Sequence, residues 1–223
     1  MDIRGRTDLP SATILRPASA RSRCSRDAAK NPWNPSLSQR SLATAKGENM
    51  QIYKLLSVLL EYPDQELLDN LPEVRAIFDK SSEIDANERV ALQKFIDYLT
   101  SKSLTDLQVD YVKTFDNIPE HSLHLTHHLF GDESDRNRGP ALIDLSEMYK
   151  EYGVELSTNE LPDYLPLILE FAAHMDDNEA MVFLSDVNKV LRTLADNLTK
   201  ADSPYAALIS IVESRATLTR LAA

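Results

Sequence analysis

The sequence predicts an all-α fold, a single helical-bundle domain of about eight to ten helices that follows a disordered N-terminal extension. Apolar residues recur with helical spacing along residues 50–223. No segment there alternates apolar and polar residues with a period of two for long enough to predict a sheet. The composition changes sharply near Met50. Residues 50–223 are enough for one domain that buries about two-thirds of the surface of its unfolded chain.

Residues 1–49 form the extension. They hold nine of the 24 basic and four of the 35 acidic residues, a net charge of +5, and only six Leu, Ile, Val or Phe. Such a segment buries too little apolar surface to offset its ordering entropy, so we predict that it is disordered. It lacks both the amphipathic spacing of a transit peptide and the apolar core of a secretory signal. We interpret it as an upstream translated or processing segment, with Met50 as the true start.

The helices follow in order from Met50. An apolar run at 52–62 stops at Pro63, and Pro72 is an acceptable first residue for a second helix, 72–80. Capping-box-like pairs, a proline or a glycine mark most of the remaining boundaries. These further helices are predicted from Asp85 to about Thr100, from Ser103 to Phe115, from Gly139 to Gly153, from near Pro162, along the apolar stripe 180–198, and from Ser203 to about Thr217.

Acidic residues lie in ordered positions on two of these helices. Asp144, Glu147 and Glu151 share one face, and Asp163 and Glu170 are predicted to face solvent, away from the apolar stripe of their own helix. Residues 50–223 carry 31 acidic and 15 basic residues, a net charge of −16. Acidic faces are most often ordinary solvated surface. Together with this net charge, however, they favour a cationic partner and disfavour nucleic acid, because phosphates would be repelled.

Several classes of function lack their motifs. The five glycines are too scattered for a phosphate-binding loop, and there is no G-x-S-x-G nucleophile elbow. The single cysteine, Cys24, lies in the extension, so no internal disulfide can form. No apolar run approaches the roughly 20 residues of a membrane span, so direct membrane insertion is not expected. We predict a non-enzymatic, cytoplasmic protein without a cofactor or resident metal.

The best argument for an enzyme is a histidine cluster. His121, His124 and His128 are spaced three and four apart, so one helical face could present all three rings to zinc or iron. Neither H-E-x-x-H nor a His-Asp dipeptide occurs. A metal-dependent hydrolase that uses these histidines is therefore the alternative hypothesis, and packing between helices or contact with a peptide is the favoured one.

Five segments, taken in order, resemble one family. They are DYVKTFD (110–116), SLHL (122–125), GD followed by DRNRG (131–139), ALIDL (141–145) and ELPDYLP (160–166). As an ordered set they are similar to the respiratory nitrate reductase molybdenum cofactor assembly chaperones, the NarJ family, within the wider TorD- and DmsD-like group of molybdoenzyme chaperones. The resemblance begins near Met50, is strongest over residues 107–175 and does not extend to residues 1–49.

The resemblance implies an all-helical chaperone. Such a protein binds the basic N-terminal segment of the apo catalytic subunit of membrane-bound nitrate reductase in the cytoplasm. It keeps that subunit competent for insertion of the molybdenum cofactor and for assembly at the membrane, with molybdenum cofactor delivery proteins as further partners. A sibling chaperone for another molybdoenzyme remains an open alternative.

The resemblance and the acidic faces together predict a client-peptide site. Aromatic side chains would contact the apolar side of an amphipathic peptide and carboxylates would face its cations, as in helix-in-groove recognition. For Tyr111 and Phe115 plain core packing is an equal alternative, because buried aromatic residues dominate cores as well as interfaces. The predicted site consists of Asp110, Tyr111, Phe115, Asp116, His124, His128, Glu160, Asp163, Tyr164, Glu170 and Phe171.

Overall fold

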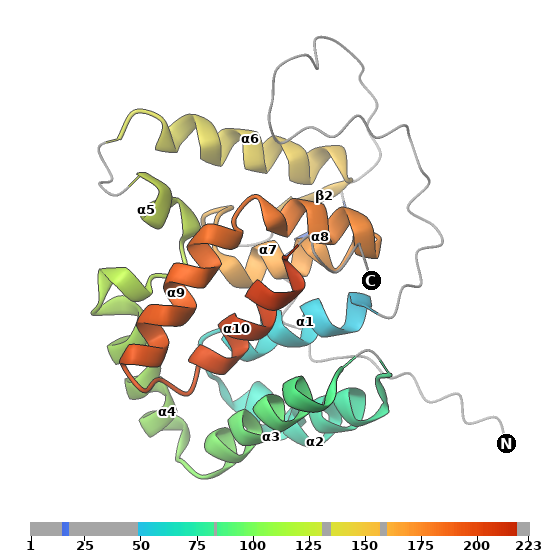
Figure 1. The fold of residues 1–223 in the computed structure, drawn as a ribbon, viewed down its shortest axis with the longest axis vertical. Helices are drawn as coiled ribbons and strands as arrows, with labels where there is room; N and C mark the ends of the chain where they lie inside the picture. Colours follow the sequence, from blue (N-terminus) through green and yellow to red (C-terminus); the bar gives the residue numbers. More distant parts are fainter. Residues whose placement is uncertain (1–14, 18–48, 83, 131–134, 157–159, 218–223) are drawn as a thin grey trace, which may run out of the picture.

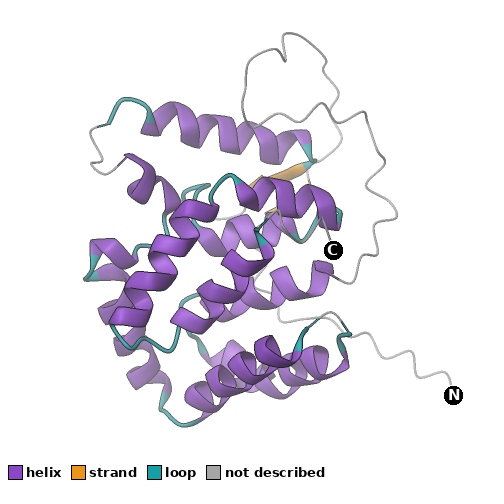
Figure 2. Cartoon of the chain, in the orientation of Figure 1, coloured by secondary structure: helices purple, strands orange, loops and turns teal. Residues whose placement is uncertain are grey.

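The structure is a computed structural model that describes residues 15–17, 49–82, 84–130, 135–156 and 160–217. In this part of the chain it contains ten α-helices, which confirms the all-α prediction (Figures 1 and 2). They are α1 (Asn49–Leu60), α2 (Gln65–Lys80), α3 (Ala86–Thr100), α4 (Leu104–Tyr111), α5 (Leu125–Phe130), α6 (Arg138–Glu151), α7 (Leu165–Ala172), α8 (Asp177–Ser185), α9 (Asn188–Lys200) and α10 (Ala206–Arg215). A π-helical turn, η1 (Val112–Asp116), continues α4, and a 3-10 turn, η2 (Pro119–His121), follows it.

Side-chain caps fix several helix starts where the sequence predicts them. The Asp85 side chain accepts hydrogen bonds from the backbone N–H groups of Asn87 and Glu88, and the Glu88 side chain accepts one from the Asp85 backbone N–H, which completes a capping box at α3. Ser103 accepts from the Asp106 backbone N–H at the start of α4. Each cap satisfies N–H groups that a helix start would otherwise leave unpaired.

The predicted start of the second helix at Pro72 is wrong. α2 begins at Gln65, where Asp64 is the N-cap and accepts a 2.7 Å hydrogen bond from the backbone N–H of Leu67. Pro72 lies inside the helix and removes one backbone hydrogen bond. The apolar side chains Leu67, Leu71, Val74 and Phe78 are nevertheless spaced along one buried face, and their burial keeps the helix continuous through the proline.

The apolar stripe at 180–198 is buried but is shared between two helices. α8 ends at Ser185 and α9 begins at Asn188, with Asp186 still in a helical conformation. Figure 1 shows α8 and α9 meeting at an angle. Because the break nearly preserves the helical spacing, all six stripe residues still face the core: Ala180, Leu184, Val187, Leu191, Leu194 and Leu198.

The core is built around α7. Every residue from Leu165 to Ala172 is buried, with α1 packed along this helix and α9 packed along α10. In Figure 1, α2 and α3 lie at one end of the molecule and α5 and α6 at the other, with α1 and α7 to α10 between them. A buried ion pair with a 2.6 Å contact between Arg215 Nη2 and Glu88 Oε2 ties α10 to α3.

Two short strands accompany the helices. β1 (Leu15–Pro17) pairs antiparallel with β2 (Val154–Leu156), with Arg16 opposite Glu155. Three residues are too few for a period-two pattern to show in the sequence. The rest of the predicted extension up to residue 48 lies outside the described residues, so its disorder and the domain boundary at Met50 stay predictions. Among the helices that the structure describes, none combines the length and the apolar character needed to cross a bilayer.

Candidate functional site

Two of the five motif segments, SLHL (122–125) and ELPDYLP (160–166), lie side by side. The backbone N–H of Leu125 donates to the carbonyl of Asp163 over 3.1 Å, and the N–H of Leu165 donates to the carbonyl of Leu123 over 2.8 Å. These bonds give the segment before α5 and the segment before α7 a fixed register, although about forty residues separate them in the sequence. The side chains of both segments therefore present one joint surface.

His124 and Tyr164 face each other in this arrangement. They form an antiparallel bridge, and their ring centroids lie 5.3 Å apart. The Nδ1 atom of His124 lies 3.4 Å from Oδ1 of Asp163, while Oδ2 of Asp163 accepts hydrogen bonds from both the N–H and the hydroxyl of Thr126. Burial alone would raise the pKa of Asp163, but the hydrogen bonds from His124 and Thr126 outweigh it and lower that pKa. Asp163 thus holds the bridge as a buried carboxylate.

A tyrosine pair orients the Tyr164 ring. The Tyr111 hydroxyl donates to the carbonyl of Leu60 over 3.0 Å and lies 2.9 Å from the Tyr164 hydroxyl. Because Tyr111 has already given its only proton to Leu60, Tyr164 is the donor between the two hydroxyls. Tyr62 packs edge-on against the Tyr111 ring at 5.4 Å and is 49% exposed. The end of α1 and the start of α7 therefore meet at Tyr111.

Carboxylates lie near enough to the Tyr164 hydroxyl to act on it. Burial raises the pKa of Tyr164 most. The negative charges of three carboxylates add to the rise, which places all three within electrostatic reach of the hydroxyl: Glu61, Glu160 and Asp116. We call the joint patch the Tyr164 surface and define it as Glu61, Tyr62, Asp116, His124, Glu160 and Tyr164.

A buried ion pair lies beneath the Tyr164 surface. Lys54 Nζ on α1 contacts Glu170 Oε1 on α7 over 2.5 Å. Glu61 is close enough for the Glu170 charge to act on it, and its Oε1 atom is buried with no hydrogen-bond partner among the described residues. Burial, followed by the Glu170 charge, raises the pKa of Glu61 to about 8, although Lys54 opposes the rise. The arrangement sets one ammonium beside the Glu170 carboxylate and beside the Glu61 carboxyl group, which stays mostly protonated below about pH 8.

Asp163 and Glu170 are not on a solvated face. Each is only 1% exposed, so the predicted exposure of these two side chains is wrong. The helical period correctly places Glu170 away from Leu165, but α7 is enclosed on all sides, and its far side faces α1 and Lys54 instead of water. Whether either residue contributes to client binding stays a prediction.

Tyr111, Phe115 and Phe171 belong to the hydrophobic core. The Phe115 ring lies 4.8 Å from Tyr111 and 4.9 Å from Tyr205, and the Phe171 ring lies 4.4 Å from Tyr149. For Tyr111 and Phe115 the structure thus realises the core-packing alternative. Only Tyr111 also reaches the Tyr164 surface, through its hydroxyl.

Asp110 and His128 make other contacts. Asp110 accepts hydrogen bonds from Lys102 Nζ over 2.5 Å and from the Tyr98 hydroxyl over 3.1 Å, and the Lys102 bond lowers the pKa of Asp110 most. His128 is half-buried, with Nε2 2.8 Å from the Ser122 carbonyl, and burial lowers its pKa. These two residues have local structural partners. The side chains of Asp116 and Glu160 are exposed.

The three histidines of the alternative hypothesis do not share a helical face. His121 ends η2, His124 lies in the bridge, and His128 lies in α5. The Nδ1 atom of His121 bonds the Thr114 carbonyl over 3.1 Å, so its ring is directed to backbone. Within the described ranges, no group of three or more His, Cys, Asp or Glu side chains could hold a metal ion.

Sequence reasoning missed Glu61 and Tyr62. Both directly follow the apolar run at 52–60 and precede Pro63, and this pattern predicts only a helix end there. A carboxylate and an aromatic ring that follow an apolar helix and precede a proline are the available signal for site residues here. The signal points to this site only when the contact between the end of α1 and Tyr111 is known.

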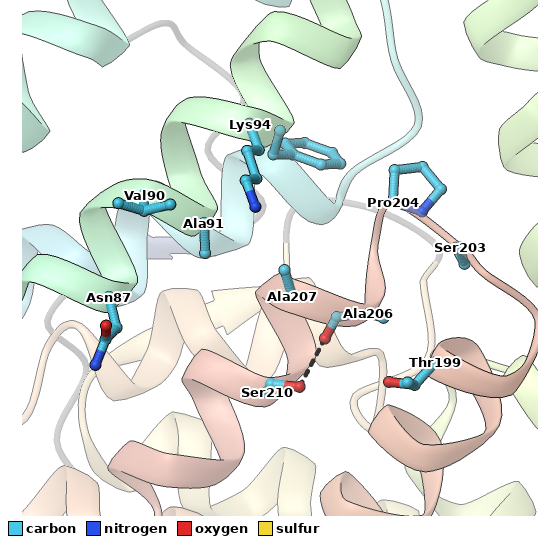
Figure 3. Close-up of a pocket in the computed structure, with 11 residues that line it drawn as sticks. Asn87, Val90, Ala91, Lys94, Thr199, Ser203, Pro204, Ala206, Ala207 and Ser210 are labelled. Atoms are coloured by element: carbon cyan, nitrogen blue, oxygen red, sulfur yellow. Dashed lines mark hydrogen bonds between the residues drawn. The ribbon is translucent and has the colours of Figure 1, made fainter.

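A separate groove of about 500 Å³ lies between α3 and α10 (Figure 3). Small and apolar side chains such as Val90, Ala91 and Ala207 line much of it, and Lys94 is its only charged lining residue. None of the predicted site residues lines this groove. Its chemistry does not suit a cationic peptide, so the Tyr164 surface is the better candidate.

Comparison with known proteins identifies the family of this chain. A family model described as nitrate reductase delta subunit matches residues 81–210, which include both motif segments. The chain is 35% identical over 158 residues to the nitrate reductase molybdenum cofactor assembly chaperone NarJ of Escherichia coli (strain K12), covering 71% of this chain and 66% of that protein. The chain thus spans slightly less than two-thirds of the length of that relative.

Two further similarities are informative. A protein named NarJ from Bacillus subtilis (strain 168) is 34% identical over 160 residues, covering 72% of this chain and 85% of that protein. The fold is similar to a solved structure from Archaeoglobus fulgidus, described as a candidate redox enzyme maturation protein, with a TM-score of 0.56 and 21% identity over 78% of this chain and 98% of that one. From the family model and the NarJ relatives together, this chain belongs to the nitrate reductase delta subunit family, which includes the NarJ assembly chaperones.

Proposed function

We propose that this protein is an assembly chaperone for the catalytic subunit of nitrate reductase. It binds the basic N-terminal segment of the apo subunit at the Tyr164 surface and keeps the subunit competent for insertion of the molybdenum cofactor, acting in the cytoplasm alongside cofactor delivery proteins. The proposal extends to this chain what the names of its NarJ relatives say of those proteins. No catalytic step is assigned to it.

The observation that carries the proposal is the charge around Tyr164. The charges of two exposed carboxylates, Asp116 and Glu160, act on the Tyr164 hydroxyl, and Tyr62 adds an exposed aromatic ring. A cation that approaches this patch gains both from the carboxylates and from the faces of the aromatic rings. The backbone bonds beneath the patch fix its geometry before the peptide arrives, so little ordering entropy is lost on binding.

The first experiment neutralises the exposed carboxylates of the Tyr164 surface. In the full chain, Asp116→Asn combined with Glu160→Gln removes two negative charges without touching the buried network. We expect the Kd of a peptide with the sequence of the client N-terminal segment to rise about tenfold, equivalent to about 1.4 kcal/mol. The melting temperature should stay within error, because both side chains are exposed. Fluorescence anisotropy of a labelled peptide and thermal unfolding measure the two quantities.

A matched control lies on α2 and α3. Asp69 and Asp97 are also exposed, and Asp69→Asn with Asp97→Asn removes the same charge from helices that contribute no residue to the Tyr164 surface or to β2. This control should bind the peptide nearly as the parent does. Equal weakening by both double variants would mean that only net charge matters and that the Tyr164 surface is not the site.

A further inference from the structure

The short strand β2 provides an edge to which an extended peptide can pair. Val154 is buried in the core and Leu156 packs against it, so the body of the domain holds β2 in place. The residues paired with this strand come from the N-terminal segment, Leu15–Pro17, and β1 also lies beside α7. The family model matches residues 81–210, which include β2 and leave out β1 together with α1 and α2. The edge thus lies within the matched region, and its occupant comes from the basic N-terminal segment.

The occupant has the chemistry proposed for the client. Residues 1–49 carry a net charge of +5 against −16 for the rest of the chain, and β1 consists of Leu15, Arg16 and Pro17, a basic residue between two apolar ones. The register places Arg16 opposite Glu155. Strand addition at a sheet edge recognises a peptide mainly through its backbone, which suits a basic and otherwise variable segment.

We propose that Leu15–Pro17 is a built-in competitor of the client, which occupies the β2 edge that the basic client peptide pairs with when it binds. The inference rests on the proposed chaperone function and extends the client path from the Tyr164 surface along α7 to β2. The client displaces β1 and forms the same antiparallel backbone pairing with Val154–Leu156.

The pairing is suited to displacement. Only three residues take part, and Pro17 has no backbone N–H to donate to the ladder. Because competitor and edge are joined in one chain, the tether sets an effective concentration that can reach the order of millimolar. At that effective concentration, even the weak pairing of β1 keeps loosely binding peptides off the β2 edge. A client that also binds the Tyr164 surface gains enough affinity to displace β1.

The test locks the competitor in place in the full chain. Opposite residues of an antiparallel pair have Cα atoms about 4.5–5.5 Å apart, a separation that a disulfide can span. In a Cys24→Ser background, Arg16→Cys with Glu155→Cys should cross-link on oxidation. The client N-terminal peptide should then bind at least tenfold more weakly to the oxidised protein than to the same protein after reduction. A control pair, Arg16→Cys with Asp196→Cys on the exposed face of α9, should not cross-link.

Three other outcomes would contradict the inference at different steps. If the Arg16–Glu155 variant does not cross-link above the control pair, β1 does not occupy the edge and the inference fails. If the oxidised and reduced forms bind the peptide equally, β1 is not a competitor, although the chaperone proposal stands. If the Cys24→Ser parent itself does not bind the peptide, the chaperone proposal fails and the inference fails with it.

Discussion

At the scale of single residues, Glu61 is the group whose protonation the fold controls most clearly. It stands at the end of α1, next to the Lys54–Glu170 ion pair, and its Oε1 atom finds no hydrogen-bond partner among the described residues. A buried carboxylate without a partner costs least when it is neutral. This is why burial and the neighbouring charge raise its pKa to about 8, above the ordinary value of 4.5.

The raised pKa predicts a pH dependence of stability. Between pH 4.5 and about 8 the folded protein binds a proton at Glu61 that the unfolded chain has released. The stability that this group contributes is therefore fully present below the lower value and is lost as the pH rises to the upper one, at up to about 1.4 kcal/mol per pH unit. Glu61→Gln keeps the side chain neutral at every pH. The free energy of unfolding of this variant should depend less on pH across this window, and it should exceed that of the parent near pH 8. Urea unfolding of both proteins measures this, and parallel pH profiles would refute it.

The sequence predicted some of the exposed residues of the candidate site, but it did not predict which of the nearby carboxylates are buried. Asp116, Glu160 and Tyr164 belong to motifs with a recognisable order, and the structure brings them together. Asp163 and Glu170 occur in the same motif region, but their contacts lie elsewhere in the sequence: Asp163 bonds Thr126 on α5, and Glu170 bonds Lys54 on α1, more than a hundred residues away. A helical period gives the direction of a side chain relative to its own helix and says nothing about what covers it.

At the scale of elements, α7 determines the geometry of the site. Its start was predictable, because proline is tolerated in the first turn, and Pro166 indeed lies there. The solvent-facing side that the sequence predicted for α7 does not exist, because all eight residues of the helix are buried. A helix that is apolar nearly all round belongs in the middle of a fold, and the single carboxylate, Glu170, is accommodated by an ammonium from α1.

Two leucines at the start of α7 test this placement. Leu165 is 0% exposed, so Leu165→Ala should lower the free energy of unfolding by about 2–5 kcal/mol through lost burial and a new cavity. Leu161 is 39% exposed, and Leu161→Ala should cost less than about 0.5 kcal/mol. Urea denaturation midpoints compare them. Similar losses for the two variants would show that the start of α7 is not the packed centre of the domain.

At the scale of the whole molecule, the charge is divided between two parts of the chain. Residues 50–223 are strongly acidic and residues 1–49 are basic, a division that the overall net charge of −11 conceals. This division was readable from the sequence, because composition requires no knowledge of contacts. The pairing of β1 with β2 was not, because three residues carry no periodic signal.

The acidic domain should attract a cationic client over a distance. We expect the association rate of the client peptide to fall markedly as the ionic strength rises from about 0.01 to 0.15 M, where the Debye length shrinks from roughly 30 to 8 Å. The dissociation rate should change less, because short-range contacts set it. Stopped-flow kinetics measures both rates. An association rate independent of salt would leave the charge a role in solubility only.

The backbone bonds between the segments that precede α5 and α7 also bear on how such a surface diversifies during evolution. The two bonds join main-chain atoms of Leu123, Leu125, Asp163 and Leu165, so they do not depend on which side chains stand at positions 124 and 164. Substitutions at those two positions can alter the chemistry presented outward while the spacing between them is inherited unchanged. A lineage can therefore change the peptide it prefers by drift at a few outward positions, without first evolving a new scaffold.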